Sequence, residues 1–136
     1  MKNLLLLLAV FTLIFLNCKK DESPEVQELF KIEGKWILED YPNTMLIFED
    51  GLRYTVYCET EDCDWGSKTT TDAIPNPEVY TFSEGTLNFD LGFGHLWEED
   101  MAFVCNGQVI RYDCNCNGYQ EYIRWYRPGY DISNCD

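Results

Sequence analysis

The chain has 136 residues, of which 24 are acidic and 10 are basic, so its formal net charge at pH 7 is −14. A protein this acidic repels phosphate groups, which excludes general binding to nucleic acid or to anionic lipid headgroups. Hydrophobic residues make up 46% of the chain, enough for a core, and the length fits one small domain.

The N-terminal segment has the pattern of a secretory signal. Lys2 is followed by an apolar run over residues 4–16 that only Thr12 interrupts. This run is shorter than the roughly 20 residues that a membrane-spanning helix needs. It therefore fits the h-region of an export signal better than a membrane anchor or a buried core helix.

The sequence that follows resembles the lipobox of bacterial lipoproteins, in which the signal is cut before a cysteine that then carries lipid. The matching residues are Leu16-Asn17-Cys18, and the next four, Lys19-Lys20-Asp21-Glu22, are similar to a tag that sends some lipoproteins to the outer cell surface. The resemblance implies a signal peptide over residues 1–17, a lipid on Cys18 and a polar tether over residues 18–33. It also implies anchoring in the bacterial outer membrane with exposure at the cell surface.

Residues 34–136 are predicted to form one all-β domain. Alternation of apolar and polar residues predicts eight strands, over residues 34–41, 44–49, 52–58, 79–83, 86–91, 97–105, 108–114 and 119–127. Tight hairpin turns are expected at Asp50-Gly51, Asn106-Gly107 and Asn117-Gly118. Short links between consecutive strands predict an antiparallel up-and-down meander, and eight such strands close into a barrel.

One connection, residues 59–78, is long. Pro75 and Pro77 exclude a central strand there, because proline cannot donate a hydrogen bond to a neighbouring strand. We expect this segment to be a loop that folds over one mouth of the barrel.

Two short motifs of the barrel region resemble the small lipocalin-like domains of bacterial lipoproteins. They are Gly34-Lys35-Trp36 at the first strand, and Phe48-Glu49-Asp50-Gly51 with Tyr54 on the following hairpin. The resemblance implies an eight-stranded barrel that binds small apolar molecules. It also implies that a late arginine, Arg124 or Arg127, packs on the face of Trp36 as a cation–π contact.

The inward faces of the strands are predicted to carry apolar side chains, including Leu46, Leu52, Leu91 and Ile110. The predicted ligand-binding residues are Trp36, Phe48, Tyr54, Val56, Leu87, Phe89, Phe103 and Tyr112. An eight-stranded barrel is just wide enough to be filled by side chains or to hold one small ligand. Two functions stay open: a ligand-binding module, and a filled barrel that interacts through exposed aromatics such as Tyr57, Tyr119, Trp125 and Tyr126.

Six cysteines remain besides Cys18, and an even number in an exported small domain predicts disulfides. In an eight-stranded meander Cys105 and Cys135 lie at the same end, which predicts a bridge between them. The other four, Cys58, Cys63, Cys114 and Cys116, lie at the opposite end. There we favour two bridges, in which Cys114 and Cys116 are each joined to either Cys58 or Cys63. Zinc bound by these four cysteines is the alternative.

The acidic residues form two clusters, which we interpret as solvated surface with calcium binding as the alternative. They are Glu59, Glu61, Asp62, Asp64 and Asp72 in the long loop, and Glu98, Glu99 and Asp100. No known catalytic motif is present, and the single histidine, His95, lies in a glycine-rich stretch. We therefore predict no enzymatic activity, no cofactor and no resident metal.

Overall fold

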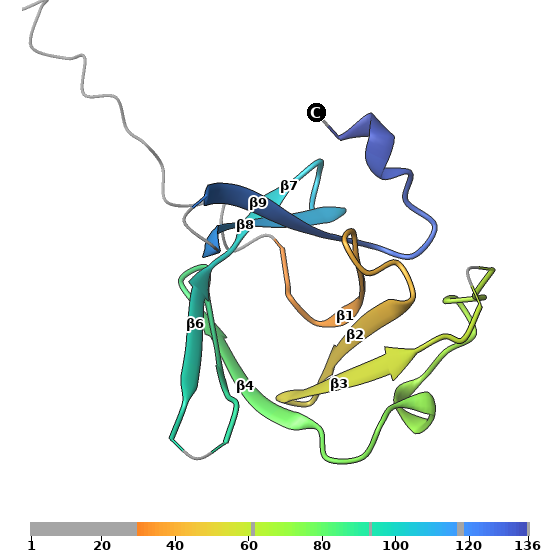
Figure 1. Cartoon of the computed structure of the whole chain (residues 1–136), viewed down its shortest axis with the longest axis horizontal. Helices are drawn as coiled ribbons and strands as arrows, with labels where there is room; N and C mark the ends of the chain where they lie inside the picture. Colours follow the sequence, from red (N-terminus) through yellow and green to blue (C-terminus); the bar gives the residue numbers. More distant parts are fainter. Residues whose placement is uncertain (1–29, 61, 93, 117–118, 136) are drawn as a thin grey trace, which may run out of the picture.

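The structure is a computed structural model that describes residues 30–135 except 61, 93, 117 and 118. For residues 114–116 and 119–121 it describes only the backbone. The described part is all-β, with nine strands and two 3-10 turns, η2 (Thr70–Asp72) and η3 (Ile132–Asn134), and it contains no α-helix (Figure 1). The strands are β1 (Gly34–Leu38), β2 (Thr44–Glu49), β3 (Leu52–Tyr57), β4 (Glu78–Ser83), β5 (Thr86–Asp90), β6 (Leu96–Asp100), β7 (Ala102–Val104), β8 (Val109–Cys116) and β9 (Tyr119–Tyr126).

All pairs of neighbouring strands are antiparallel, in the order β6-β5-β4-β3-β2-β1-β9-β8-β7. The two outermost strands, β6 and β7, follow each other directly in the chain. The sheet therefore curls into a nearly closed barrel (Figure 1). This confirms the predicted antiparallel meander, but the predicted full closure is not reached, because β6 and β8 are not paired.

The strand count is nine rather than the predicted eight, because the expected strand over residues 97–105 is divided at Met101. Its first part, β6, pairs with β5, and its second part, β7, pairs with β8. The Met101 N–H donates to the carbonyl of Gly85 at 2.8 Å, so the chain turns a corner there and exchanges one neighbour for the other. The bend leaves β6 and β8 unpaired with each other.

Two of the predicted turn dipeptides have the backbone that was expected. Asp50 and Gly51 have φ of 52° and 75°, and Asn106 and Gly107 have φ of 56° and 75°. The values at Asp50-Gly51 fit the two-residue turn between the paired Glu49 and Leu52, whereas Asn106-Gly107 lies in a four-residue link between the paired Val104 and Val109. The third dipeptide, Asn117-Gly118, lies outside the described residues.

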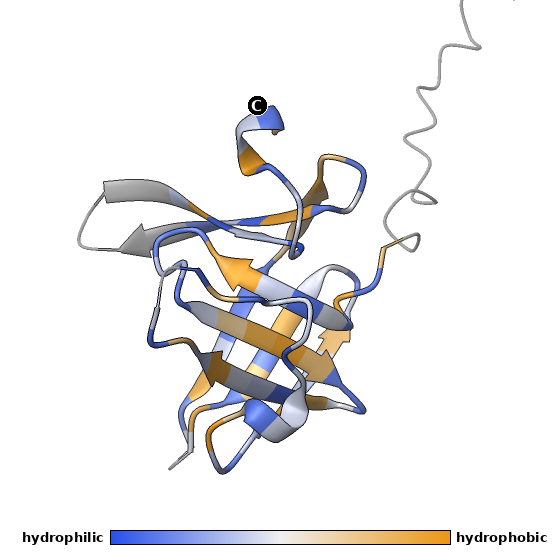
Figure 2. Cartoon of the chain, turned by 90° about the vertical axis from the view of Figure 1, so that its right-hand side faces the viewer, coloured by the Kyte–Doolittle hydropathy of each residue, from blue (hydrophilic) through white to orange (hydrophobic). Residues whose placement is uncertain are grey.

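Apolar side chains form one core inside the barrel and a smaller one outside it. Successive residues of a strand point to opposite faces, so Trp36 and Leu46 lie in the inner core while Ile37 and Met45 lie in the outer one. Figure 2 shows hydrophobic segments along several strands, with hydrophilic turns between them.

The long loop packs on the outer core and does not cover a mouth of the barrel, so that expectation was wrong. Trp65 and Ala73 pack against the outer cluster, and Lys35 Nζ donates to the carbonyl of Gly66 at 2.8 Å. The Ile74 N–H donates to Thr55 O at 2.9 Å. The physical reason is that β1, β2 and β3 also carry buried apolar side chains on their outer face, namely Ile37, Met45, Ile47 and Val56, and this face needs a cover.

Two disulfides link cysteines whose side chains the structure describes, and one of them was predicted. Cys105 and Cys135 are bridged, with Cα atoms 5.7 Å apart. The favoured cross-pairing at the other end was wrong, because Cys58 and Cys63 are bridged to each other, with Cα atoms 6.1 Å apart. The chain turns back directly after β3, which brings these two together. Their bond also excludes the four-cysteine zinc site; the side chains of Cys114 and Cys116 lie outside the described part.

Candidate functional site

One end of the barrel is closed by Trp36, which is fully buried and donates its indole N–H to the carbonyl of Ile32 at 2.6 Å. Arg127 covers the ring, with Cζ 3.6 Å from the centroid. Its guanidinium donates to the carbonyls of Glu33 at 3.0 Å and Lys31 at 3.1 Å. The expected arginine on Trp36 is therefore Arg127, whereas Arg124 forms an ion pair with Glu39.

The glycine of the Gly-Lys-Trp motif is required by this closure. Gly34 has φ of 108°, a conformation that residues with a Cβ rarely adopt. A Cβ at this position would also lie 2.5 Å from Nη1 of Arg127. At the same end Phe30 stacks on Phe103 with ring centroids 5.9 Å apart. The closed end thus leaves no room beside the guanidinium of Arg127.

Aromatic rings in mutual contact fill much of the barrel interior. Phe89 stacks on Trp97 at 4.5 Å between centroids, and Trp97 meets the edge of Tyr112 at 5.7 Å. Tyr112 in turn lies 5.4 Å from Trp125, and Phe48 lies 6.1 Å from Trp125. Six of the eight predicted ligand-binding residues belong to this inner core or pack against it: Trp36, Phe48, Leu87, Phe89, Phe103 and Tyr112.

The other two, Tyr54 and Val56, face outward and pack in the outer core. The two-residue hairpin places Phe48 opposite Arg53 and Ile47 opposite Tyr54, and opposite residues share a face. Since Phe48 points inward, Arg53 does so too, and Tyr54 cannot.

Other members of the predicted inward set also differ. Leu52 shares the outward face of Tyr54, and Leu91 lies beyond the end of β5 with 51% of its surface exposed. Leu46 and Ile110 are in the inner core as expected.

Arg53 is the inward-facing cation that the sequence patterns did not reveal. Its side chain is 15% exposed, its Cζ lies 4.1 Å from the centroid of Phe89, and it forms an ion pair with Glu78. Burial lowers the pKa of Arg53 to about 10, so the group stays charged at neutral pH. Its buried Nε has no hydrogen-bond partner in the described structure. The hairpin register was the signal that would have identified it.

Two further hydrogen-bond donors lie in the same interior. Trp125 is only 3% exposed, and its indole N–H makes no hydrogen bond of acceptable geometry. The indole nevertheless lies close enough to the Tyr112 hydroxyl to lower the pKa of that hydroxyl. Burial is the main cause that raises the pKa of Tyr112 to about 12, so its hydroxyl keeps its proton. Trp125 was expected on the surface; it is buried because it lies opposite the inward-facing Ile110.

The other three aromatic residues that were predicted to be exposed are Tyr57, Tyr119 and Tyr126, and their outcomes differ. Tyr57 is 56% exposed, as expected. Tyr126 is half-buried against the outer core, and the side chain of Tyr119 lies outside the described part.

The end opposite Trp36 has an apolar rim. Four large hydrophobic side chains that are more than half exposed come from the connections and strand ends there: Tyr41, Tyr57, Leu91 and Leu96. Arg53 contacts Phe89 and Glu78, which lie next to this end of β5 and β4. The open end therefore combines an aromatic floor, a cation and apolar edges.

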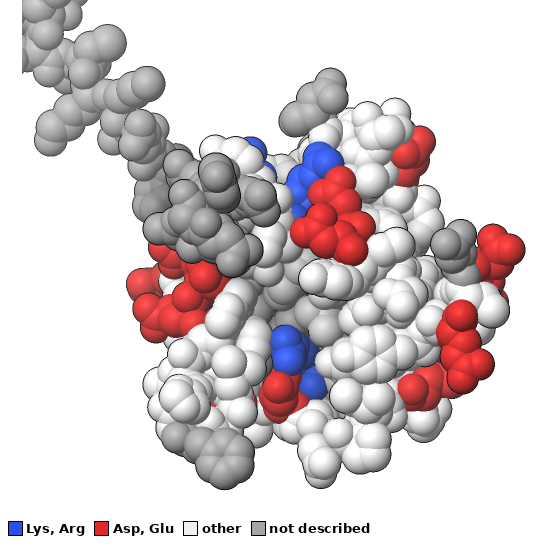
Figure 3. Space-filling view, viewed as in Figure 1, with Lys and Arg blue, Asp and Glu red and all other residues white. Residues whose placement is uncertain are grey.

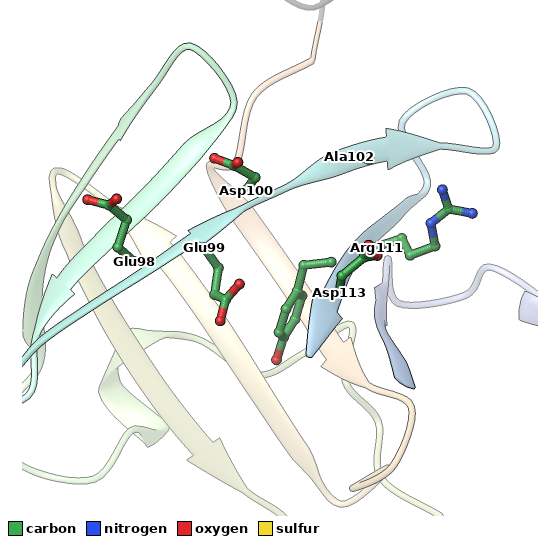
Figure 4. Close-up of a pocket in the computed structure, with 7 residues that line it drawn as sticks. Glu98, Glu99, Asp100, Ala102, Arg111 and Asp113 are labelled. Carbon is green, nitrogen blue, oxygen red and sulfur yellow. The ribbon is translucent and has the colours of Figure 1, made fainter. Parts of the chain in front are cut away.

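A separate cleft of about 450 Å³ lies where β6 and β8 diverge (Figure 4). Its lining is mostly charged: Glu98, Glu99, Asp100, Ala102, Arg111, Tyr112 and Asp113. Figure 3 shows an acidic patch over β6. Burial, followed by the neighbouring Asp100 and Asp113, raises the pKa of Glu99. Acids of the second sequence cluster thus gather at this cleft.

No three His, Cys, Asp or Glu side chains of the described residues are grouped so as to hold a metal ion. His95 is exposed in the turn between β5 and β6. Within the same residues, no helix has the length and apolar character needed to cross a membrane. No family model matches the chain, and neither does any curated protein or solved structure.

Proposed function

We propose that this protein is a lipoprotein of the bacterial outer membrane, anchored at the cell surface through a lipid on Cys18, with a lipocalin-like barrel that binds a small apolar molecule. The ligand enters at the open end and carries a hydrogen-bond-accepting head, such as a carboxylate. The observation that carries the proposal is Arg53, a buried cation on an aromatic wall whose Nε lacks a partner.

Buried donors in folded proteins nearly always have an acceptor, and leaving one unpaired costs free energy. Arg53 uses part of its donor set on Glu78 and keeps Nε free. A carboxylate bound there would pair with the guanidinium and would lie near the Tyr112 and Trp125 donors. The unpaired donors are thus explained if the natural state of the barrel includes a bound acceptor.

The aromatic contacts limit where the ligand lies. Trp36, Phe48, Leu87 and Phe103 form the packed floor of the site, together with the closed end. Phe89 and Tyr112 remain as walls, joined by the half-buried Trp97. The apolar body of the ligand then lies against these rings and the exposed rim, which suits a partly enclosed hydrophobic site with a few polar groups.

The second candidate function is an interaction module with a filled barrel. It is favoured by the unbroken series of ring contacts from Phe48 to Phe89, which resembles a close-packed core. In that case the exposed Tyr41 and Leu96 at the rim contact a partner protein rather than a ligand.

Probe binding separates these functions. The mature chain, residues 18–136 with Cys18→Ser to remove the lipid, needs no detergent and is titrated with a fluorescent fatty acid and with the methyl ester of the same probe. We expect saturable binding of the acid, about tenfold or more weaker binding of the ester, and loss of this preference in Arg53→Met. Arg111→Met, which changes an exposed arginine, is the matched control and should keep it. Absence of saturable binding would place the interaction module first.

The anchor is tested on the unaltered protein. Mass spectrometry of the mature N-terminus from membranes should show an acylated Cys18, because two or more acyl chains give stable anchoring. An uncut signal, or a free N-terminus at another residue, would refute the lipid anchor without bearing on the barrel.

A further inference from the structure

β6 has a free edge. It pairs with β5 along residues 96–100, and the chain leaves for β8 only after Met101. β8 in turn is paired with β7 only over residues 109–111, so its following residues pair with β9 alone. Backbone N–H and C=O groups at such edges accept an additional strand.

The cleft beside this edge is strongly acidic. Four of its lining residues carry carboxylates and one, Arg111, is basic. Arg111 lies over the ring of Tyr122, with Cζ 4.9 Å from the centroid. Figure 4 shows Glu99 on one side of β6 and Glu98 and Asp100 on the other. The cleft therefore presents acidic groups on both sides of a free strand edge.

A second observation points to an occupant. Tyr112 lines the cleft and is only 9% exposed, so its hydroxyl lies in a largely desolvated place. Glu99 lies opposite the fully buried Leu87, so its carboxylate is directed inward toward the same region. A protonated hydroxyl and a half-buried carboxylate at one place fit an amine or a guanidinium, which donates to both.

Charges on an edge strand also prevent identical chains from pairing with one another. Glu98, Glu99 and Asp100 do this for β6, since a second copy would set acid against acid. This protection does not act against a basic strand, for which the same carboxylates are attractive.

We propose that the cleft between β6 and β8 binds an extended basic peptide segment of a partner protein, which adds as a strand to the free edge of β6. Main-chain hydrogen bonds give the segment its register. One lysine or arginine side chain reaches Glu99 and Tyr112, and basic residues one position away meet Glu98 and Asp100 on the other face. The site adjoins the ligand site at the open end, and Tyr112 borders both.

The test uses fluorescence anisotropy with three labelled eight-residue peptides and the mature chain, residues 18–136 with Cys18→Ser. The peptides are valine with three consecutive lysines at the centre, the same sequence with glutamate for lysine, and the lysine peptide with alternate backbone nitrogens methylated. Only the first should bind saturably, with a Kd of about 10–1000 μM that weakens as salt is added. Glu99→Gln should weaken binding about tenfold, whereas Glu49→Gln, an exposed acid on the β2–β3 hairpin, should not change it.

Each other result overturns the proposal. No binding of the lysine peptide at millimolar concentration excludes the site, and equal binding to Glu99→Gln shows that the acidity of the surface as a whole is responsible. Equal binding of the methylated peptide excludes strand addition. Thermal unfolding of both variants controls for misfolding.

Discussion

Two arginines stack on aromatic rings near opposite ends of the barrel, and their surroundings differ in one respect. Arg127 on Trp36 donates to main-chain carbonyls of the segment that precedes β1, so its burial is compensated. Arg53 on Phe89 has a single ion-pair partner and a buried, unpaired Nε. The same contact therefore has a structural role at the closed end, whereas at the open end it leaves a donor for a ligand.

The largest effect on this comparison is expected from Trp36→Ala. It removes a fully buried ring and leaves Arg127 without its aromatic platform. We expect the free energy of unfolding to fall by about 3–5 kcal/mol, as for other large-to-small core changes. Urea unfolding followed by circular dichroism measures this, with the exposed Tyr41→Ala as control. An equal, small effect of both changes would show that the closed end is not a packed core.

The two disulfides extend the comparison, since Cys105–Cys135 lies at the closed end and Cys58–Cys63 at the open end. They close chain segments of very different length, with sequence separations of 30 and 5. In the chain-entropy model the longer loop stabilises by about 3–4 kcal/mol and the shorter one by about 2 kcal/mol. Paired Cys→Ser variants in urea unfolding should show this order, and the opposite order would mean that the loop over the outer core depends on its bridge.

Exchanging each arginine for methionine compares the two sites directly. Arg127→Met should lower the free energy of unfolding by about 1–3 kcal/mol, because it leaves several carbonyls without their donor. Arg53→Met should cost less than about 1 kcal/mol, since it also removes a desolvated charge and an unpaired N–H. If Arg53→Met is the more damaging change in urea unfolding, Arg53 is a structural residue.

The smallest expected effect concerns the pH dependence of Glu99. Its pKa is raised in the folded protein, so the protonated form is favoured there. Its contribution to stability is then greatest below the unfolded-state pKa of about 4.3 and is lost as pH rises through the folded-state pKa. Glu99→Gln should therefore have a slightly higher Tm than the unaltered protein at pH 7, with the difference shrinking or reversing toward pH 4. A difference that is constant with pH would contradict the assigned cause.

The hairpin at Asp50-Gly51 shows both how far local sequence was informative and where it was misread. The turn and both strands were predicted, because their signals lie within a few residues. The faces of β3 were inverted, since its apolar side was taken as the inner one. Turn length alone places Arg53 beside Phe48, so this register was contained in the sequence.

Local patterns by themselves determined the all-β class, the order of strands, most of the inner core and the Cys105–Cys135 bridge. These follow from side-chain alternation and turn residues, which act over short distances. Only the tertiary structure decided the bend at Met101, the packing of the long loop on the outer core and the Cys58–Cys63 bridge. It also decided the meeting of Arg53, Tyr112 and Trp125 inside the barrel, because contacts between distant strands depend on how the sheet curls and closes.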